Sequence, residues 1–163
     1  MGEGLHIRAA SIHDVARLAA WACTMARETE DKRLDPDVVR RGITAVLDEP
    51  RRGRYFVACI DDEPVGTLML TYEWSDWRCA DWWWIQSVYV APDHRRAGVY
   101  RALYAHVRTE AQANPMVCGL RLYMERDNAA AQRTYESLGM HDAGYVVYEE
   151  PISAAARAVS RAG

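Results

Sequence analysis

Apolar residues recur along the chain with two different spacings, and these spacings predict its helices and strands. Apolar positions three and four residues apart predict helices at residues 11–27, 36–47, 98–113 and 128–138. Short runs rich in β-branched and aromatic residues predict strands at residues 6–10, 55–60, 65–74, 81–90, 119–125 and 142–149. Ser11 and Asp14 have the spacing of a capping box, and Asp35-Pro36 gives the second helix a cap and a first-turn proline.

The elements follow one another in the order β-α-α-β-β-β-α-β-α-β. This order predicts an α/β fold of the α+β type, with a mixed, mostly antiparallel central sheet of about six to seven strands and helices on both faces. No linker divides residues 1–152, so we expect one domain there. The alanine- and arginine-rich tail at residues 153–163 is expected to be a frayed helix or disordered.

Composition excludes several classes of protein. The net charge of −3 and pI near 5.9 argue against a general nucleic-acid binder. No apolar run approaches the ~20 residues that a membrane span needs, and the start of the chain lacks the pattern of a signal peptide. The four cysteines are scattered without a Cys-x-x-Cys pair, which predicts reduced thiols, a cytoplasmic protein and no bound metal.

A basic loop between a strand and a helix is the strongest local signal for a ligand. The strand ends before Pro92, and the loop containing Arg95, Arg96 and Gly98 runs directly into a helix that carries Arg101. The first amides of a helix lack internal partners and lie at its positive end, so they can bind an anion. The pattern favours a phosphate or pyrophosphate site over the alternative, a solvated basic helix start.

Two motifs carry a family resemblance, each at a strand–helix junction. The first is Arg95-Arg96-Ala97-Gly98-Val99-Tyr100, and the second is Asn128-Ala-Ala-Ala131-Gln-Arg-Thr-Tyr135, followed by Leu138-Gly139-Met140. Together they resemble the GNAT acyltransferase superfamily over roughly residues 6–150. Tyr100 departs from the family pattern, because a small residue usually stands there. Its side chain must therefore point away from the pyrophosphate or reshape the site.

The resemblance implies an N-acetyltransferase that moves an acetyl group from acetyl-CoA to a primary amine of a small molecule or peptide by direct attack. It implies that Asn128 binds the pantetheine arm and that Tyr135 is the general acid for the CoA thiolate. The alternative for Tyr135 is a packed core aromatic, and the alternative for the protein is a non-catalytic CoA-binding or regulatory module. The other implied cofactor-binding residues are Val88, Val90, Arg95, Arg96, Ala97, Gly98, Val99, Tyr100 and Arg101.

The acceptor side is less determined. Glu73 is the candidate general base, with an ordinary surface glutamate as the alternative; Asp81 and Gln86 are further polar candidates. Five of the six tryptophans lie between residues 74 and 84. Regular alternation puts Trp83, Ile85, Ser87 and Tyr89 on one face of their strand and Trp82, Trp84, Gln86 and Val88 on the other. We expect Trp83 in the core and Gln86 at the substrate as a polar positioner. Trp77 and Trp84 are expected at the substrate or, alternatively, at a homodimer surface.

Overall fold

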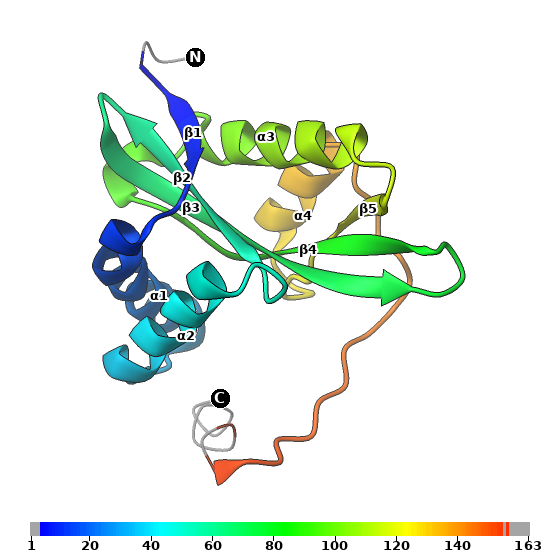
Figure 1. Ribbon diagram of the computed structural model, residues 1–163, viewed down its shortest axis with the longest axis horizontal. Helices are drawn as coiled ribbons and strands as arrows, with labels where there is room; N and C mark the ends of the chain where they lie inside the picture. The colour runs from blue at the N-terminus through cyan, green and yellow to red at the C-terminus, as the bar shows by residue number, and fades with distance from the viewer. Residues whose placement is uncertain (1–3, 155, 157–163) are drawn as a thin grey trace.

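The computed structural model describes residues 4–154 and 156 of the chain, and these residues form one mixed sheet flanked by helices (Figure 1). The sheet has five strands in the spatial order β1-β2-β3-β4-β5, of which β1 to β4 are antiparallel and β5 is parallel to β4. The strands are β1 (His6–Ala9), β2 (Arg54–Ile60), β3 (Glu63–Ser75), β4 (Ala80–Val90) and β5 (Val117–Arg121). The helices are α1 (Val15–Glu30), α2 (Pro36–Asp48), α3 (Val99–Ala113) and α4 (Ala129–Ser137), with short 3-10 turns at Ile12–Asp14 and Pro92–His94.

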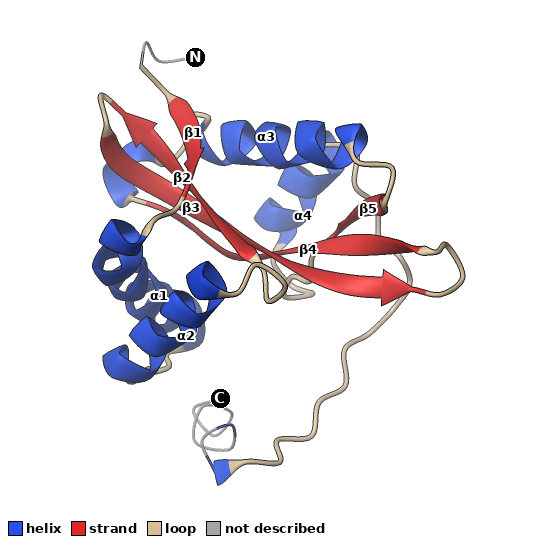
Figure 2. Cartoon of the chain, viewed as in Figure 1, coloured by secondary structure: helices blue, strands red, loops and turns tan. Residues whose placement is uncertain are grey.

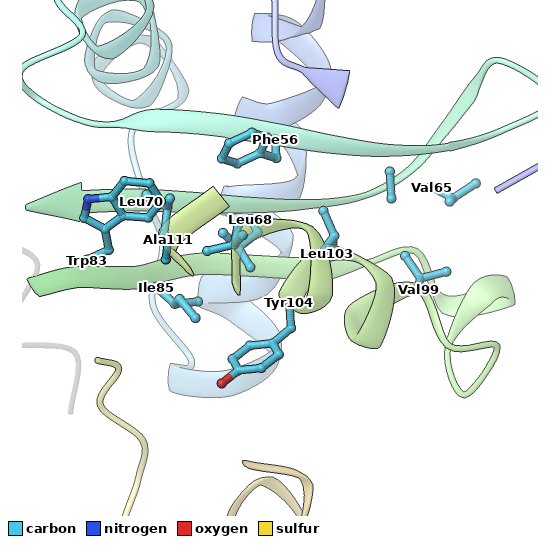
Figure 3. Packing of buried hydrophobic residues seen from close by; sticks show 12 residues of the cluster. Phe56, Val65, Leu68, Leu70, Trp83, Ile85, Val99, Leu103, Tyr104 and Ala111 are labelled. Atoms are coloured by element: carbon cyan, nitrogen blue, oxygen red, sulfur yellow. The ribbon is translucent and has the colours of Figure 1, made fainter. Parts of the chain in front are cut away.

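Helices cover the two faces of the sheet, as Figure 2 shows. On one face, Leu18 of α1 and Ile43 of α2 pack against Val57 and Cys59 of β2. On the other, α3 packs through its apolar side on the larger core cluster. Figure 3 shows this cluster around Phe56, Leu68, Leu70, Trp83, Ile85, Val99, Leu103, Tyr104 and Ala111. The predicted fold class is therefore confirmed, although the described sheet has five strands rather than six or seven.

The missing strand is the one predicted at residues 142–149. This segment is extended but forms no strand, and most of it is exposed to solvent. A β-rich sequence makes a strand only where another strand is available to pair with it, and the chain after α4 leads away from the sheet (Figure 1). The predicted strand at residues 119–125 is also shifted, to Val117–Arg121. The predicted tail at residues 153–163 lies largely outside the described residues.

A β-bulge changes the direction of side chains along β4. Met69 of β3 pairs with Gln86, but Thr67 pairs with Tyr89, so β4 contains one more residue than β3 over this stretch. Ser87 takes a left-handed conformation there, with φ of 48°. Because of the extra residue, the predicted regular alternation is wrong. Trp83 and Ile85 face α3, whereas the Tyr89 ring lies 5.5 Å from the Trp21 ring of α1.

The turn before α1 is held by a part-buried ion pair, in which Asp14 is buried and Arg8 is partly exposed. The Arg8 guanidinium donates to both carboxylate oxygens of Asp14 at 2.8 Å, and the backbone N–H of Ser11 donates to the same carboxylate at 2.7 Å. The capping box predicted for Ser11 and Asp14 is present. These donors stabilise the ionised form, chiefly the hydrogen bonds from Arg8, and lower the Asp14 pKa from 3.8 to about 2.

We predict that Asp14→Asn lowers the free energy of unfolding at neutral pH by about 1–3 kcal/mol, because it weakens the charged hydrogen bonds that a buried carboxylate accepts from Arg8 and Ser11. Since the folded pKa is depressed, this contribution is complete above the unfolded pKa and is lost as pH falls through the folded pKa. Wild-type protein should therefore lose stability between about pH 4 and pH 2 in a way that the variant does not. Chemical denaturation across this range measures both effects.

The matched control is Asp37→Asn, which removes an exposed pair with Arg40 at 3.2 Å on the first turn of α2. That change should lower the free energy of unfolding by less than about 0.5 kcal/mol. Identical acid dependence in wild-type protein and the Asp14 variant would contradict the assignment.

Candidate active site

The site begins where β4 loses its pairing with β5. The parallel ladder between these strands runs from Asp81 paired with Val117 to Trp84 paired with Arg121. After Arg121 the chain turns away toward α4, so residues 85–90 of β4 have no ladder partner on that side within the described structure. Backbone N–H and C=O groups along an open strand edge can pair with an extended ligand.

The start of α3 follows directly after this open edge. Arg96 and Gly98 both have left-handed backbones, with φ of 64° and 83°. The Ala102 N–H, which belongs to the fourth residue of α3, donates to the Gly98 carbonyl at 3.0 Å. The amides of the three helix residues before Ala102 therefore lie at the open end of the helix. A β-carbon at Gly98 would meet no heavy atom within 4 Å, so the space beside this turn is open. Free helix amides beside open space can bind an anion, and residues 95–101 are therefore called the anion-binding turn below.

Arg95 is directed toward the opposite face of the sheet. Its Nε donates to the Val90 carbonyl at 3.0 Å, and its guanidinium donates to Glu28 of α1 at 2.9 Å. It also lies over the Tyr89 ring, 5.5 Å from the centroid. Arg96 and Arg101 are exposed. Of the three predicted arginines, these two can offer their side chains to an anion at the start of α3.

The Tyr100 side chain points inward, away from the open end of α3. Its ring lies 6.3 Å from that of Tyr104 and 6.0 Å from that of Tyr135, in an edge-on contact with the latter. Its hydroxyl is buried and has no hydrogen-bond partner among the described residues. Burial, with a smaller effect of Tyr135 and Tyr104, raises the Tyr100 pKa. The unusual residue in the first motif therefore joins α3 to α4 instead of filling the anion-binding turn.

The second motif places two polar groups on α4. The Asn128 side-chain oxygen caps the helix by accepting the Ala131 N–H at 3.0 Å, which leaves the Asn128 amide group as a donor. The helix ends as predicted, with Gly139 at φ of 91° and the Met140 N–H bonded to the Tyr135 carbonyl at 3.1 Å. Tyr135 is half-buried, and burial raises its pKa, so its phenol is protonated at neutral pH.

A cavity of about 430 Å³ lies on the α1–α2 side of the sheet and reaches the bulge. Met25 of α1, Leu34 of the loop between the helices, and Val39 and Ile43 of α2 give it apolar walls, with Glu30 and Lys32 also in its lining. Its sheet side consists of Tyr55, Met69 and Ser87. Burial raises the Tyr55 pKa, and a hydrogen bond with the Ser87 side chain partly offsets this effect. Ser87 therefore lies between the cavity and the open edge of β4.

The predicted acceptor-side residues lie elsewhere along β3 and β4. Glu73 is ion-paired with Arg121 at 2.5 Å, four residues beyond Met69, or about 13 Å of strand from the bulge. Trp77 is 86% exposed in the β3–β4 turn, and the Trp84 ring packs 6.1 Å from that of Tyr123. Gln86 donates to the Thr71 hydroxyl. The structure thus brings Gln86 close to the bulge but does not bring Glu73 or Trp77 there.

A larger cavity, of about 530 Å³, lies at the other end of α3. It is lined by Asp81, Trp83 and Asn114, together with Arg54 and Glu110, which pair at 2.9 Å. The Arg54 guanidinium also covers the Trp83 ring, 4.8 Å from its centroid. Arg54 and Glu110 are already paired with each other, and the cavity is separated from Gly98 by the length of α3. We therefore do not include it in the candidate site.

Sequence reasoning missed Tyr55, Met69 and Ser87, because no local signal marks the extra residue in β4.

Among the described residues no cluster of three histidine, cysteine, aspartate or glutamate side chains could hold a metal ion. None of the helices described is both long and apolar enough to span a bilayer.

Comparisons with known proteins agree with the fold. A "possible acetyltransferase from Clostridium difficile 630" is 40% identical, with a TM-score of 0.86 over 93% of this chain and 99% of that one. A structure described as "a probable acetyltransferase" is 26% identical, with a TM-score of 0.79 over 91% and 98% of the two chains. A predicted acetyltransferase with acetyl-CoA from Clostridium acetobutylicum is 13% identical, with a TM-score of 0.71 over 90% and 96%, and shows similarity of fold alone. A search of curated proteins found no match.

The family comparison covers most of the chain. The sequence profile of the acetyltransferase (GNAT) family matches residues 13–140, a range that contains both motifs, the bulge and the open edge of β4. The resemblance drawn from the motifs is confirmed: the chain belongs to the GNAT acetyltransferase family.

Proposed function

We propose that this protein transfers the acetyl group of acetyl-CoA to a primary amine of a small molecule or peptide. The observation that carries the proposal is the convergence of three features at one place. These are the open edge of β4, the anion-binding turn at the start of α3, and the protonated phenol of Tyr135, which is joined to that helix by Tyr100. A ligand that has an extended amide-containing arm, a pyrophosphate and a thioester fits all three.

The residues present fit CoA. Backbone groups of Val88 and Val90 would pair with the pantetheine arm, and the side-chain amide of Asn128 would donate to it. The pyrophosphate would be bound by the backbone amides of Arg96, Gly98, Val99, Tyr100 and Arg101, because those of Arg95 and Ala97 donate to the carbonyls of Pro92 and His94. Arg96 and Arg101 would add charge, whereas the Arg95 side chain remains paired with Glu28.

The chemistry requires two groups near the thioester. The amine nitrogen attacks the carbonyl carbon, and an oxyanion develops on the carbonyl oxygen, which a backbone N–H at the β4 bulge near Val88 would stabilise. The C–S bond then breaks, and the thiolate takes its proton from the phenol of Tyr135. The proton that the attacking nitrogen loses as the amide forms passes through solvent and restores the phenol. The raised pKa of Tyr135 keeps that proton available across the pH range in which an amine becomes neutral.

The cavity between α1, α2 and the bulge supplies a route for the acceptor. Its apolar walls suit an amine with a hydrocarbon or aromatic body, and Ser87 lies at the end next to the thioester. Gln86 would help to position the acceptor. We assign no role in transfer to Glu73, which is paired with Arg121, to Trp77 in the β3–β4 turn, or to Trp84, which packs against Tyr123.

An amine panel tests the proposal directly. Purified protein is incubated with acetyl-CoA and with amines that differ in the size of their apolar body, and the release of free CoA thiol is followed. We expect turnover that depends on the amine and is faster for amines with an apolar body. Binding of acetyl-CoA without turnover on any amine would contradict transfer and favour a CoA-binding module.

Tyr135→Phe tests the assigned acid. The variant keeps the ring but removes the proton donor, so we expect kcat to fall by about 100-fold or more while the KM for acetyl-CoA changes little. The matched control is Tyr104→Phe, a tyrosine of α3 that is buried beside Tyr100 and has no role in transfer. Equal losses in rate and in CoA affinity for Tyr135→Phe would indicate a packing role instead.

A further inference from the structure

A glycine stands in the middle of α2, where neither the backbone nor the packing requires one. Gly42 is the seventh of the thirteen residues of this helix. Glycine at such a position makes a helix less stable than alanine would, because the unfolded chain has more conformational freedom to lose. The φ of Gly42 is not positive, and an added β-carbon would meet no heavy atom within 4 Å. The fold alone therefore does not explain Gly42.

Gly42 lines the cavity of about 430 Å³ that lies between α1, α2 and the sheet. Val39 and Val46 also line it, three residues before Gly42 and four residues after it. At this spacing the three positions form one row along α2, so Gly42 is a gap between two valines. On the α1 side, the lining includes Ala22 and Ala26, which are one helical turn apart. Small residues on both helices therefore keep space open between them.

The polar groups of this cavity indicate what kind of molecule it holds. At the sheet end lie the hydroxyls of Tyr55 and Ser87, which share a hydrogen bond. The charged residues of the lining, Glu30 and Lys32, pair with each other at 2.5 Å, so their charges offset each other. The volume falls within the range of small-molecule sites, about 300–1,000 Å³. The matching occupant is a small molecule with one polar end and an uncharged apolar body.

We propose that Gly42 sets the size of the amine that this protein acetylates: its missing side chain leaves room for an aromatic or branched apolar body, with the nitrogen at Ser87. The assignment of this occupant as the acetyl acceptor rests on the proposed acetyl transfer. A larger residue at position 42 fills the space between Val39 and Val46, so only shorter amines fit. Glycine thus lowers the stability of α2 and enlarges the site, two effects that a structural glycine would not combine.

Binding of phenethylamine, with CoA present in place of acetyl-CoA so that no transfer takes place, tests the size limit separately from the reaction. In protein with isotope-labelled methionine methyl groups, the amine should shift the signals of Met25 and Met69, which line the cavity, and not that of Met116. In Gly42→Leu its dissociation constant should rise about tenfold or more, because the leucine occupies the same space. Unchanged binding in this variant would overturn the proposal.

The alanine variant tests why the glycine is there. Gly42→Ala should raise the melting temperature by about 2 °C and also weaken phenethylamine binding, since the methyl group supports the helix but projects into the cavity. A lower melting temperature would show that the fold requires glycine and would overturn the proposal. The matched control for the leucine variant is Arg41→Leu, which adds the same side chain at an exposed position outside the cavity lining and should bind phenethylamine as wild-type protein does.

Turnover of two amines of different size separates the size limit from acetyl transfer itself. Gly42→Leu should lower kcat/KM for phenethylamine about tenfold or more, while kcat/KM for ethylamine and the KM for acetyl-CoA change by less than about twofold. Equal losses with both amines would overturn the size limit and leave acetyl transfer supported. If phenethylamine binds as expected but no amine is acetylated, the proposed function is wrong and Gly42 still limits the size of the bound amine.

Discussion

Over one short stretch, β4 loses its regular hydrogen-bonded pairing with both neighbouring strands. The rest of the structure depends on this constraint. On one side, an extra residue between Gln86 and Tyr89 breaks its register with β3. On the other, β5 stops pairing after Trp84. Backbone groups that a continuous sheet would use in its ladders are thereby left for something else. The bulge also lets Ser87 face a cavity on the α1–α2 side while Val88 contacts the α3 side.

The helices that face this stretch are fixed by packing more than by polar contacts. Val99 and Leu103 anchor α3 on the sheet, so the open end of the helix stays beside Val90. Tyr100 extends the same packing to Tyr135, at the cost of a buried hydroxyl without a described partner. A residue that looked like an obstacle in the cofactor motif therefore holds the proposed acid next to the proposed cofactor site. The fold uses the side chain of Tyr100 for packing and leaves its backbone for binding.

Features encoded within a few neighbouring residues could be predicted from the sequence. The caps at Ser11 and Asp35, the glycine stop at Gly139 and both motifs on their strand–helix junctions are local, and they gave the family and most of the fold. Features that depend on distant partners could not be predicted. The bulge at Ser87 is a shift in the pairing of β4 with β3, so it depends on both strands. The Arg95 side chain turns away from the start of α3 because it pairs with Glu28, 67 positions earlier. Residues 142–149 have strand propensity, but their sequence does not say whether an edge is available to pair with them.

The central claim is that the open edge of β4 and the start of α3 form one binding surface for acetyl-CoA. Titration of isotope-labelled protein with acetyl-CoA, followed by backbone amide chemical shifts, tests it most directly. The account predicts that the largest changes fall on Val88, Val90 and the amides of Gly98 to Arg101, with a smaller change at Tyr135. Changes confined to the larger cavity, at Arg54, Trp83 and Glu110, would contradict it.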